Sequence, residues 1–138
     1  MNLKKTPIHI HHIGSHFTSA MFPAASVLLT IFIFTGERSL ERASFYCLLF
    51  GAAAAPFVYA SGAYDWRTRF QARRTRIFDH KLFFGVIFVI LSLIIIVSRV
   101  LWPDLMTENG SYKWVYLAMV YTATAVAGYL GHLGSKFI

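Results

Sequence analysis

Four long stretches of this chain carry no charged side chain, and they limit what it can fold into. They cover residues 17–36, 43–64, 82–98 and 114–135 of a chain of 138 residues. A helix needs about 20 mostly apolar residues to cross roughly 30 Å of hydrocarbon. Charged residues make up 14% of the chain, well below the roughly 25% of an average soluble protein. The sequence therefore predicts an integral membrane protein with four spanning helices.

The predicted fold is an all-α bundle of four transmembrane helices, with spans at about residues 17–36, 43–64, 80–102 and 114–135. The loops between the spans are short, so residues 1–138 are expected to form one integral membrane domain. The first apolar stretch is longer than the roughly 7–15 apolar residues of a secretion signal. We therefore expect it to be retained as a helix.

Lysine and arginine are distributed unevenly between the two predicted sides of the membrane. Both termini and the middle loop share one side, which carries nine of these residues, whereas the other side carries four. Because loops rich in lysine and arginine stay in the cytoplasm, both termini are predicted to be cytoplasmic. The arginine-rich residues 67–81 are expected to form a basic interfacial segment, which, if helical, would present Trp66, Phe70 and Ile77 toward lipid. This topology accounts for the net charge of +7 without a nucleic-acid partner.

All six histidines fall at the predicted cytoplasmic end. Three precede the first span, and three lie at the ends of spans: His9, His11 and His12 in the first group, His16, His80 and His132 in the second. The single cysteine, Cys47, excludes an internal disulfide, a covalently attached c-type haem and a zinc site of several thiolates. A cofactor is therefore expected to bind through histidine, methionine or carboxylate side chains.

Three histidines from separate helices at one membrane depth indicate a haem b site, which needs axial ligands such as a histidine pair. We favour His80 with His132 as the ligands, and His16 is the alternative. In four-helix bundles, such sites are built by side chains of facing helices. Small residues would leave room for the porphyrin ring, and the candidates are Ala20, Ala24, Ala125 and Gly128. Arginines would bind its propionates, and the candidates are Arg73, Arg74 and Arg76.

Each of these features also has a simpler explanation. An interfacial histidine can extend its ring to the headgroups without any special role, and membrane topology alone explains the arginines. Small residues recur every four positions in the last span, at Ala123, Ala127, Gly131 and Ser135, which suits helix packing. His9, His11 and His12 could instead chelate a surface metal. Asp65 and His132 are the only ionisable groups expected near the bundle interior, which disfavours a transporter.

Several short motifs resemble those of a largely uncharacterised family of four-helix bacterial inner-membrane proteins. They are HFTSAMFPAA (residues 16–25), SGAYDW (61–66), the histidine that opens the third span, and GYLGHLG (128–134). The family shows HFPIAL-like, TGLLDW-like and GWLGGHL-like motifs in the same order. The resemblance implies that His16, His80 and His132 match family histidines and are haem or metal ligands. Met21 stands where the family motif has a histidine, which implies a lost ligand or a thioether in its place.

The leading functional hypothesis is a membrane-embedded haem b subunit that transfers electrons, in a bacterial inner membrane, between a quinone pool and a partner redox protein. A quinone is a candidate second cofactor, and Tyr121 or Asp65 could assist its binding. The alternative is a non-catalytic anchor or accessory subunit of a larger complex. A metal carrier or sensor that uses the N-terminal histidines is a third possibility. No set of nucleophile, base and orienting group indicates a stand-alone hydrolase.

Overall fold

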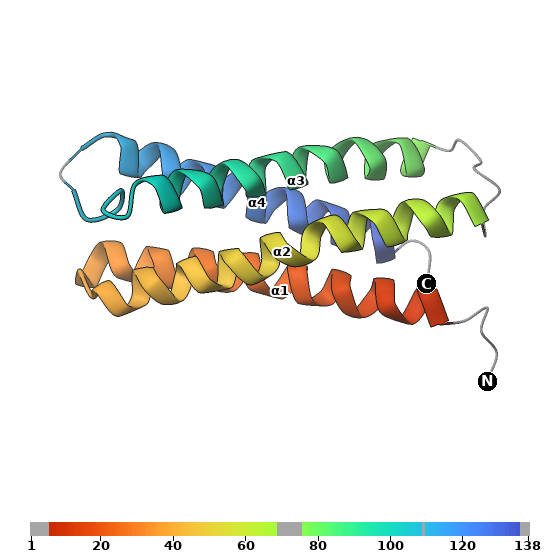
Figure 1. Ribbon diagram of the computed structural model, residues 1–138, viewed down its shortest axis with the longest axis horizontal. Coiled ribbons are helices and arrows are strands. Elements are labelled where there is room, and N and C mark those ends of the chain that lie inside the picture. Colours follow the sequence, from red (N-terminus) through yellow and green to blue (C-terminus); the bar gives the residue numbers. More distant parts are fainter. Residues whose placement is uncertain (1–5, 69–75, 109, 136–138) are drawn as a thin grey trace.

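Four long helices make up the computed structural model of the protein, which describes residues 6–68, 76–108 and 110–135 (Figure 1). They are α1 (Thr6–Thr35), α2 (Arg38–Thr68), α3 (Arg76–Leu101) and α4 (Tyr112–Ser135). Each contains a segment long and apolar enough to cross a membrane. The predicted all-α fold with four candidate spans is therefore confirmed.

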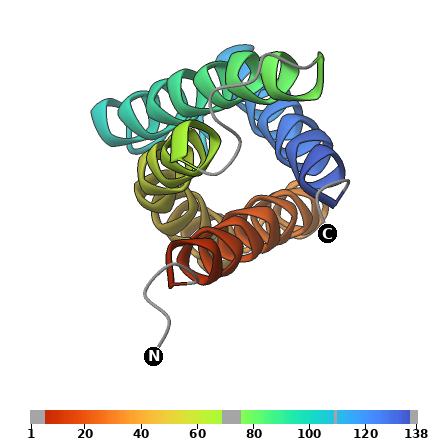
Figure 2. The ribbon, with the colours of Figure 1, turned by 90° about the vertical axis from the view of Figure 1, so that its right-hand side faces the viewer.

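The helices run alternately up and down and form a square bundle when seen along their length (Figure 2). Each helix packs against its two neighbours in chain order, with α4 closing the ring against α1. Among the described residues, the backbones of diagonal helices stay apart, but the side chains of Phe22 on α1 and Phe88 on α3 meet across the centre. We call one end the loop end, where α1 joins α2 and α3 joins α4. The opposite end, where α1 begins and α4 ends, is the histidine end because His16, His80 and His132 lie toward it.

Several helix boundaries differ from the predicted spans. Helix α1 begins at Thr6 rather than near residue 17, and it continues without a break through Gly14 and Ser15. Helix α2 begins at Arg38 because α1 ends sharply at Gly36, whose φ of 71° suits a residue without a Cβ and whose N–H donates to the Phe32 carbonyl. The ends of the predicted basic segment belong to α2 and α3, and residues 69–75 lie outside the described residues.

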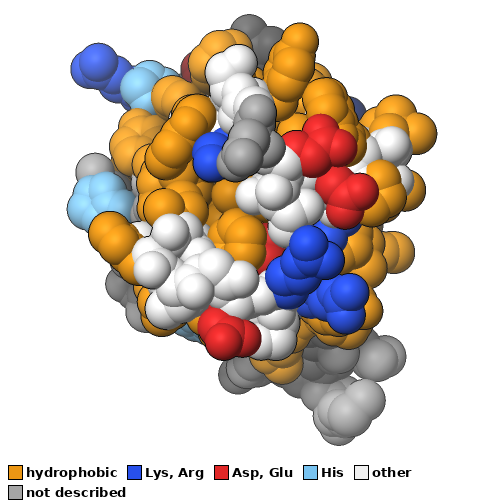
Figure 3. Space-filling view, turned by 90° about the vertical axis from the view of Figure 1, so that its left-hand side faces the viewer, with side chains coloured by type: hydrophobic (Ala, Val, Ile, Leu, Met, Phe, Trp, Pro, Cys, Tyr) orange, Lys and Arg blue, Asp and Glu red, His pale blue; other side chains and the backbone are white. Residues whose placement is uncertain are grey.

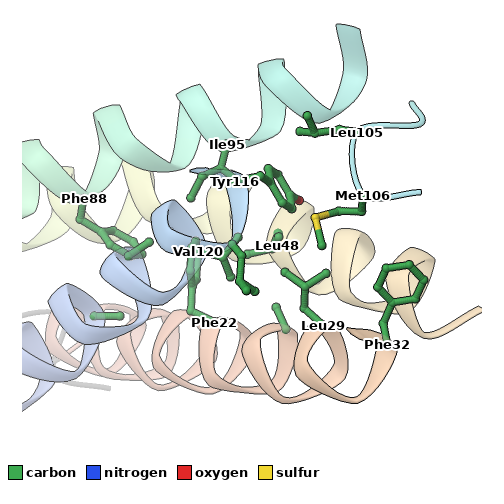
Figure 4. Close-up of a cluster of buried hydrophobic side chains, with 14 of the residues drawn as sticks. Phe22, Leu29, Phe32, Leu48, Phe88, Ile95, Leu105, Met106, Tyr116 and Val120 are labelled. Atoms are coloured by element: carbon green, nitrogen blue, oxygen red, sulfur yellow. The ribbon is translucent and has the colours of Figure 1, made fainter. Parts of the chain in front are cut away.

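The buried core changes in character along the bundle. At its middle, the rings of Phe22 and Phe88 pack with centroids 4.8 Å apart. Toward the loop end, small residues such as Ser44 and Ser92 are buried among many large side chains: Leu29, Phe32, Leu48, Ile95, Leu105, Met106, Tyr116 and Val120 (Figure 4). Toward the histidine end, fewer large side chains are buried, among them Phe78 and Leu133, together with four small residues: Thr18, Ala55, Gly85 and Ala127. We call these four residues the small-residue layer.

The outer faces of α3 and α4 also differ. Helix α3 exposes branched aliphatic side chains along its length, as expected for contact with lipid: Val86, Ile90, Leu93, Ile94, Val97 and Val100. Helix α4 exposes small or polar residues over its central and last turns: Ala118, Tyr121, Thr122, Ala125, Gly128, Gly131 and His132. The face of α4 is therefore better suited to close contact with another surface than to lipid alone.

Candidate functional site

His80 is the best-positioned of the predicted ligands. It lies in the first turns of α3, half-buried, with its Nδ1 atom 3.0 Å from the hydroxyl oxygen of Tyr129 on α4. The ring of Phe84 packs edge-on against both neighbours, with centroids 6.2 Å from His80 and 5.0 Å from Tyr129. In the tautomer that carries its proton on Nδ1, His80 donates to Tyr129 and keeps the Nε2 lone pair for another ligand.

The other two predicted ligands, His16 on α1 and His132 on α4, are exposed. The structure brings His16, His80 and His132 to one end of the bundle, on three helices. It does not gather them into a metal cluster, because no group of three His, Cys, Asp or Glu side chains in the described part of the chain could hold an ion. The side chains of His9, His11, His12 and Asp65 lie outside the described residues.

The residues predicted to make room for a porphyrin do not line the interior. Ala20, Ala125 and Gly128 are exposed, and Ala24 is half-buried. The small residues that are buried toward the histidine end are those of the small-residue layer, of which only Ala127 stood out in the sequence, as a packing residue. The predicted faces were therefore wrong, because helices that are apolar all round give little periodicity from which to assign a face.

The remaining predicted site residues are scattered. Met21 is half-buried and packs where α1 meets α2, its Cβ within 3.2 Å of the position that a Cβ on Gly51 would take. Arg76 is the exposed first residue of α3, whereas Arg73 and Arg74 lie outside the described residues. Met21 therefore contacts α2, while His80 faces α4.

Thr18 adds a polar group that the sequence did not single out. It is 6% exposed, and its hydroxyl is the buried side-chain oxygen without a hydrogen-bond partner among the described residues. Thr18, Phe22, Ala25 and Leu29 follow one another at spacings of four, three and four residues, and all four are buried. This spacing defines one face of a helix, so the Thr18 side chain is directed into the bundle.

Hydroxyl groups also join α1 to α4 near the middle of the bundle. Ser26 Oγ and Thr124 Oγ1 are 2.6 Å apart, and Thr124 also donates to the Phe22 carbonyl at 3.2 Å. The hydroxyls of Thr30 and Tyr121 form a further short hydrogen bond. Tyr121, which was considered as a quinone contact, is thus part of a helix-packing seam.

At the loop end, Glu41 and Arg99 form an ion pair inside the bundle. Arg99 donates from Nε to Glu41 Oε1 at 2.6 Å and from Nη2 to Oε2 at 2.9 Å, and their side chains are 13% and 5% exposed, respectively. The guanidinium also lies 5.1 Å from the ring centroid of Phe45. The expectation that only Asp65 and His132 approach the interior as ionisable groups was therefore wrong. Glu41 was missed because the predicted second span began after it.

An open pocket of about 570 Å³ lies beside this ion pair, between the end of α3 and the start of α4. Its walls are mainly apolar and aromatic: Ser98, Leu101, Trp102, Leu105, Tyr112, Val115, Tyr116 and Met119. On the face at the loop end, most of the acidic and basic side chains gather on one side, beside uncharged polar and hydrophobic ones (Figure 3). The loop end thus has an ion pair in its interior and further charged side chains on its surface.

The two ends differ in what they offer to a bound group. At the loop end, the acid and the base neutralise each other in a two-pronged contact. At the histidine end, an imidazole is held by one nitrogen, and one buried hydroxyl lacks a partner among the described residues. These residues supply an oriented nitrogen donor and a hydrogen-bond donor, two kinds of group that a haem b site also uses.

Comparison with known proteins identifies a family and no closer relative. A family model described as "Predicted membrane protein (DUF2231)" matches residues 6–138. No curated protein and no solved structure matches the chain. The match confirms a membrane protein family, while haem binding and the short motifs stay predictions.

Proposed function

Because the chain belongs to the DUF2231 family of predicted membrane proteins, whose description leaves the activity open, we propose its function from the geometry of the histidine end. The protein is a haem b electron-transfer subunit of the bacterial inner membrane, with both termini in the cytoplasm. It passes electrons between a quinone pool and a partner redox protein.

The hydrogen bond between His80 and Tyr129 carries this proposal. Histidines that bind a metal nearly always donate their other ring N–H to a neighbouring acceptor, which fixes the tautomer and the orientation of the ring. The Tyr129 hydroxyl lies 3.0 Å from His80 Nδ1 and is such an acceptor. The half-buried position of His80 between two helices is also typical of a cofactor ligand in a four-helix bundle.

The other predicted residues have roles around His80. His132 would supply a second nitrogen ligand, with His16 as the alternative, and Arg73, Arg74 and Arg76 would bind the carboxylates of the cofactor. Haem b would supply reversible one-electron exchange. Ligation by two histidines would suit electron transfer better than oxygen chemistry.

A visible spectrum tests the proposal. The protein, purified in detergent from cells supplied with haem, is expected to give a dithionite-reduced minus oxidised spectrum of b type and a positive pyridine haemochrome assay. His80→Ala should abolish both, and His132→Ala should abolish or alter them. His9→Ala, which changes a histidine outside the proposed ligand set, serves as the control. A flat spectrum with no iron bound to the wild-type protein would contradict the proposal.

The outer face of α4 favours a second candidate function, an anchor or accessory subunit. Ala118, Ala125 and Gly128 are exposed there, and small residues let a neighbouring helix approach closely. A photo-crosslinking residue at position 125 should then form a defined adduct with another membrane subunit. The same residue at position 94 of α3, among exposed aliphatic side chains, should react with lipid only. Equal labelling at both positions, with a flat haem spectrum, would leave neither function supported.

A further inference from the structure

Among the described residues, Tyr116 has the largest fully buried side chain, 1% exposed, and its hydroxyl makes no hydrogen bond to any of them. The two charged groups that act on it, Glu41 and Arg99, bond to each other instead. Thr18 carries the wholly enclosed hydroxyl without a partner in the described part of the chain, so the hydroxyl of Tyr116 keeps some access. The pocket that Tyr116 lines provides this access, and Figure 4 shows the hydroxyl pointing toward the loop end. Since an unpaired polar group in an apolar site is unfavourable, this position favours a ligand that supplies an acceptor.

The pocket between the end of α3 and the start of α4 has room for such a ligand. Its volume of about 570 Å³ lies within the roughly 300–1,000 Å³ of small-molecule sites. Most of its polar side chains are already engaged or exposed. Ser98 donates to the carbonyl four residues earlier at 2.7 Å, Trp102 donates to the Glu108 carboxylate at 3.1 Å, and Tyr112 is exposed. Tyr116 is therefore the buried polar group that the pocket leaves for a ligand.

The position of the pocket indicates that its ligand comes from the bilayer. Leu101 and Val115, two of its lining residues, are exposed on helices that are long and apolar enough to span the membrane. The rings of Trp102 and Tyr112 pack beside it with centroids 5.2 Å apart. Tryptophan and tyrosine collect where headgroups meet the hydrocarbon. The pocket thus opens toward lipid at the level where acyl chains are joined to the glycerol backbone.

The charges beside the pocket favour a neutral acceptor over an anion. The Arg99 guanidinium is already neutralised by the two carboxylate oxygens of Glu41, and Asp104 acts on it as well. A second carboxylate, such as that of a free fatty acid, would be repelled by these two acids. An ester carbonyl accepts a hydrogen bond without bringing a charge into the site.

We propose that the pocket holds one acyl chain of a bilayer phospholipid and that the Tyr116 hydroxyl donates a hydrogen bond to the ester carbonyl of that chain. The chain runs past Met119, one turn further along α4, toward the middle of the membrane, and the headgroup stays at the surface. This inference goes beyond the proposed haem function and does not depend on it, because the pocket lies at the opposite end of the bundle from His80.

A pair of lipids that differ only at the carbonyl tests the hydrogen bond. Native mass spectrometry measures the binding of a single dioleoyl phosphatidylcholine to the delipidated full-length protein in micelles, and of its diether analogue, which lacks both ester carbonyls. The wild-type protein should bind the ester lipid about 3- to 10-fold more tightly, as expected for one neutral hydrogen bond. Tyr116→Phe should bind both lipids equally, whereas Tyr46→Phe, which removes an exposed hydroxyl of α2, should keep the preference.

Filling the pocket tests its role as the site of the chain. Met119→Trp adds bulk to the lining and should weaken binding of the ester lipid at least about 10-fold. Leu93→Trp makes a similar change on the exposed face of α3 and should leave the affinity unchanged. Far-UV circular dichroism and gel filtration confirm that each variant is folded.

The outcomes are distinct from those that test the haem function. An ester preference that is absent from the wild-type protein, or that persists in Tyr116→Phe, overturns the inference, as does equal binding to the Met119→Trp and Leu93→Trp variants. A protein that copurifies with a quinone in place of a phospholipid overturns the identity of the occupant. The b-type spectrum reports the histidine end and should be the same in all these variants.

Discussion

The loop half and the histidine half of the bundle are built differently, although the same four helices pass through both. In the loop half, the buried acid Glu41 is paired with Arg99 in two hydrogen bonds. In the histidine half, the Thr18 hydroxyl is buried without a partner among the described residues, and His80 is held through one ring nitrogen. The two halves therefore differ in their polar groups: the buried charges of the loop half satisfy each other, whereas the polar groups of the histidine half leave hydrogen-bonding or ligand capacity unused.

The largest expected effect concerns the ion pair of the loop half. Glu41→Ala or Arg99→Met alone should destabilise the protein by about 3–5 kcal/mol, because each leaves its partner charged and buried. The free energy of unfolding is measured by denaturant titration in mixed micelles. Arg42→Met, which removes an exposed charge next to Glu41, should change it by less than about 0.5 kcal/mol.

A double substitution sharpens this result. Glu41→Leu combined with Arg99→Met should recover most of the lost stability, since two well-packed apolar residues can replace a buried ion pair. If the double variant is no more stable than the single ones, the pair does more than satisfy its own charges, and the loop end would need a functional explanation.

Core packing in the loop half should give the next effect. Leu48 is fully buried, so Leu48→Ala should cost about 2 kcal/mol. This value is at the lower end of the usual range because the alternative environment is lipid, and only packing is lost. Leu49→Ala, one residue further along α2 on the exposed side, is the control. Equal effects of the two substitutions would argue against a packed core in this half.

A smaller effect is expected at the Gly85 contact in the histidine half. Gly85→Ala brings a methyl group within 2.8 Å of the Tyr59 ring and should cost about 1–2 kcal/mol through overpacking. Gly128→Ala meets no atom within 4 Å and should stabilise the helix by up to about 1 kcal/mol. Thermal unfolding in detergent measures both. A stabilising Gly85→Ala would mean that Tyr59 moves freely away from the layer.

The sequence predicted the spans well because charge-free runs are a local property, and each run became a helix in a bundle of the expected class. It could not show which face of each helix would be buried. Ala125 and Ala127 look alike in a span that is apolar all round, yet one is exposed and the other buried. Pairings such as His80–Tyr129 and Glu41–Arg99 join residues 49 and 58 positions apart. Only the packing of the helices brings such residues together, so composition gives no sign of them.

The smallest effect on stability should accompany the most specific effect on binding. Tyr129→Phe removes the acceptor of the His80 ring and should cost only about 0.6 kcal/mol of stability, typical of a hydrogen bond between membrane helices. Haem affinity should nevertheless fall about 10- to 100-fold, because a metal-binding histidine depends on its hydrogen-bond partner. Tyr121→Phe removes an equivalent bond to Thr30 and should cost the same stability with no effect on haem. If both tyrosine variants bind haem equally, the Tyr129 hydroxyl merely joins two helices, and the proposal that His80 is an oriented ligand loses its basis.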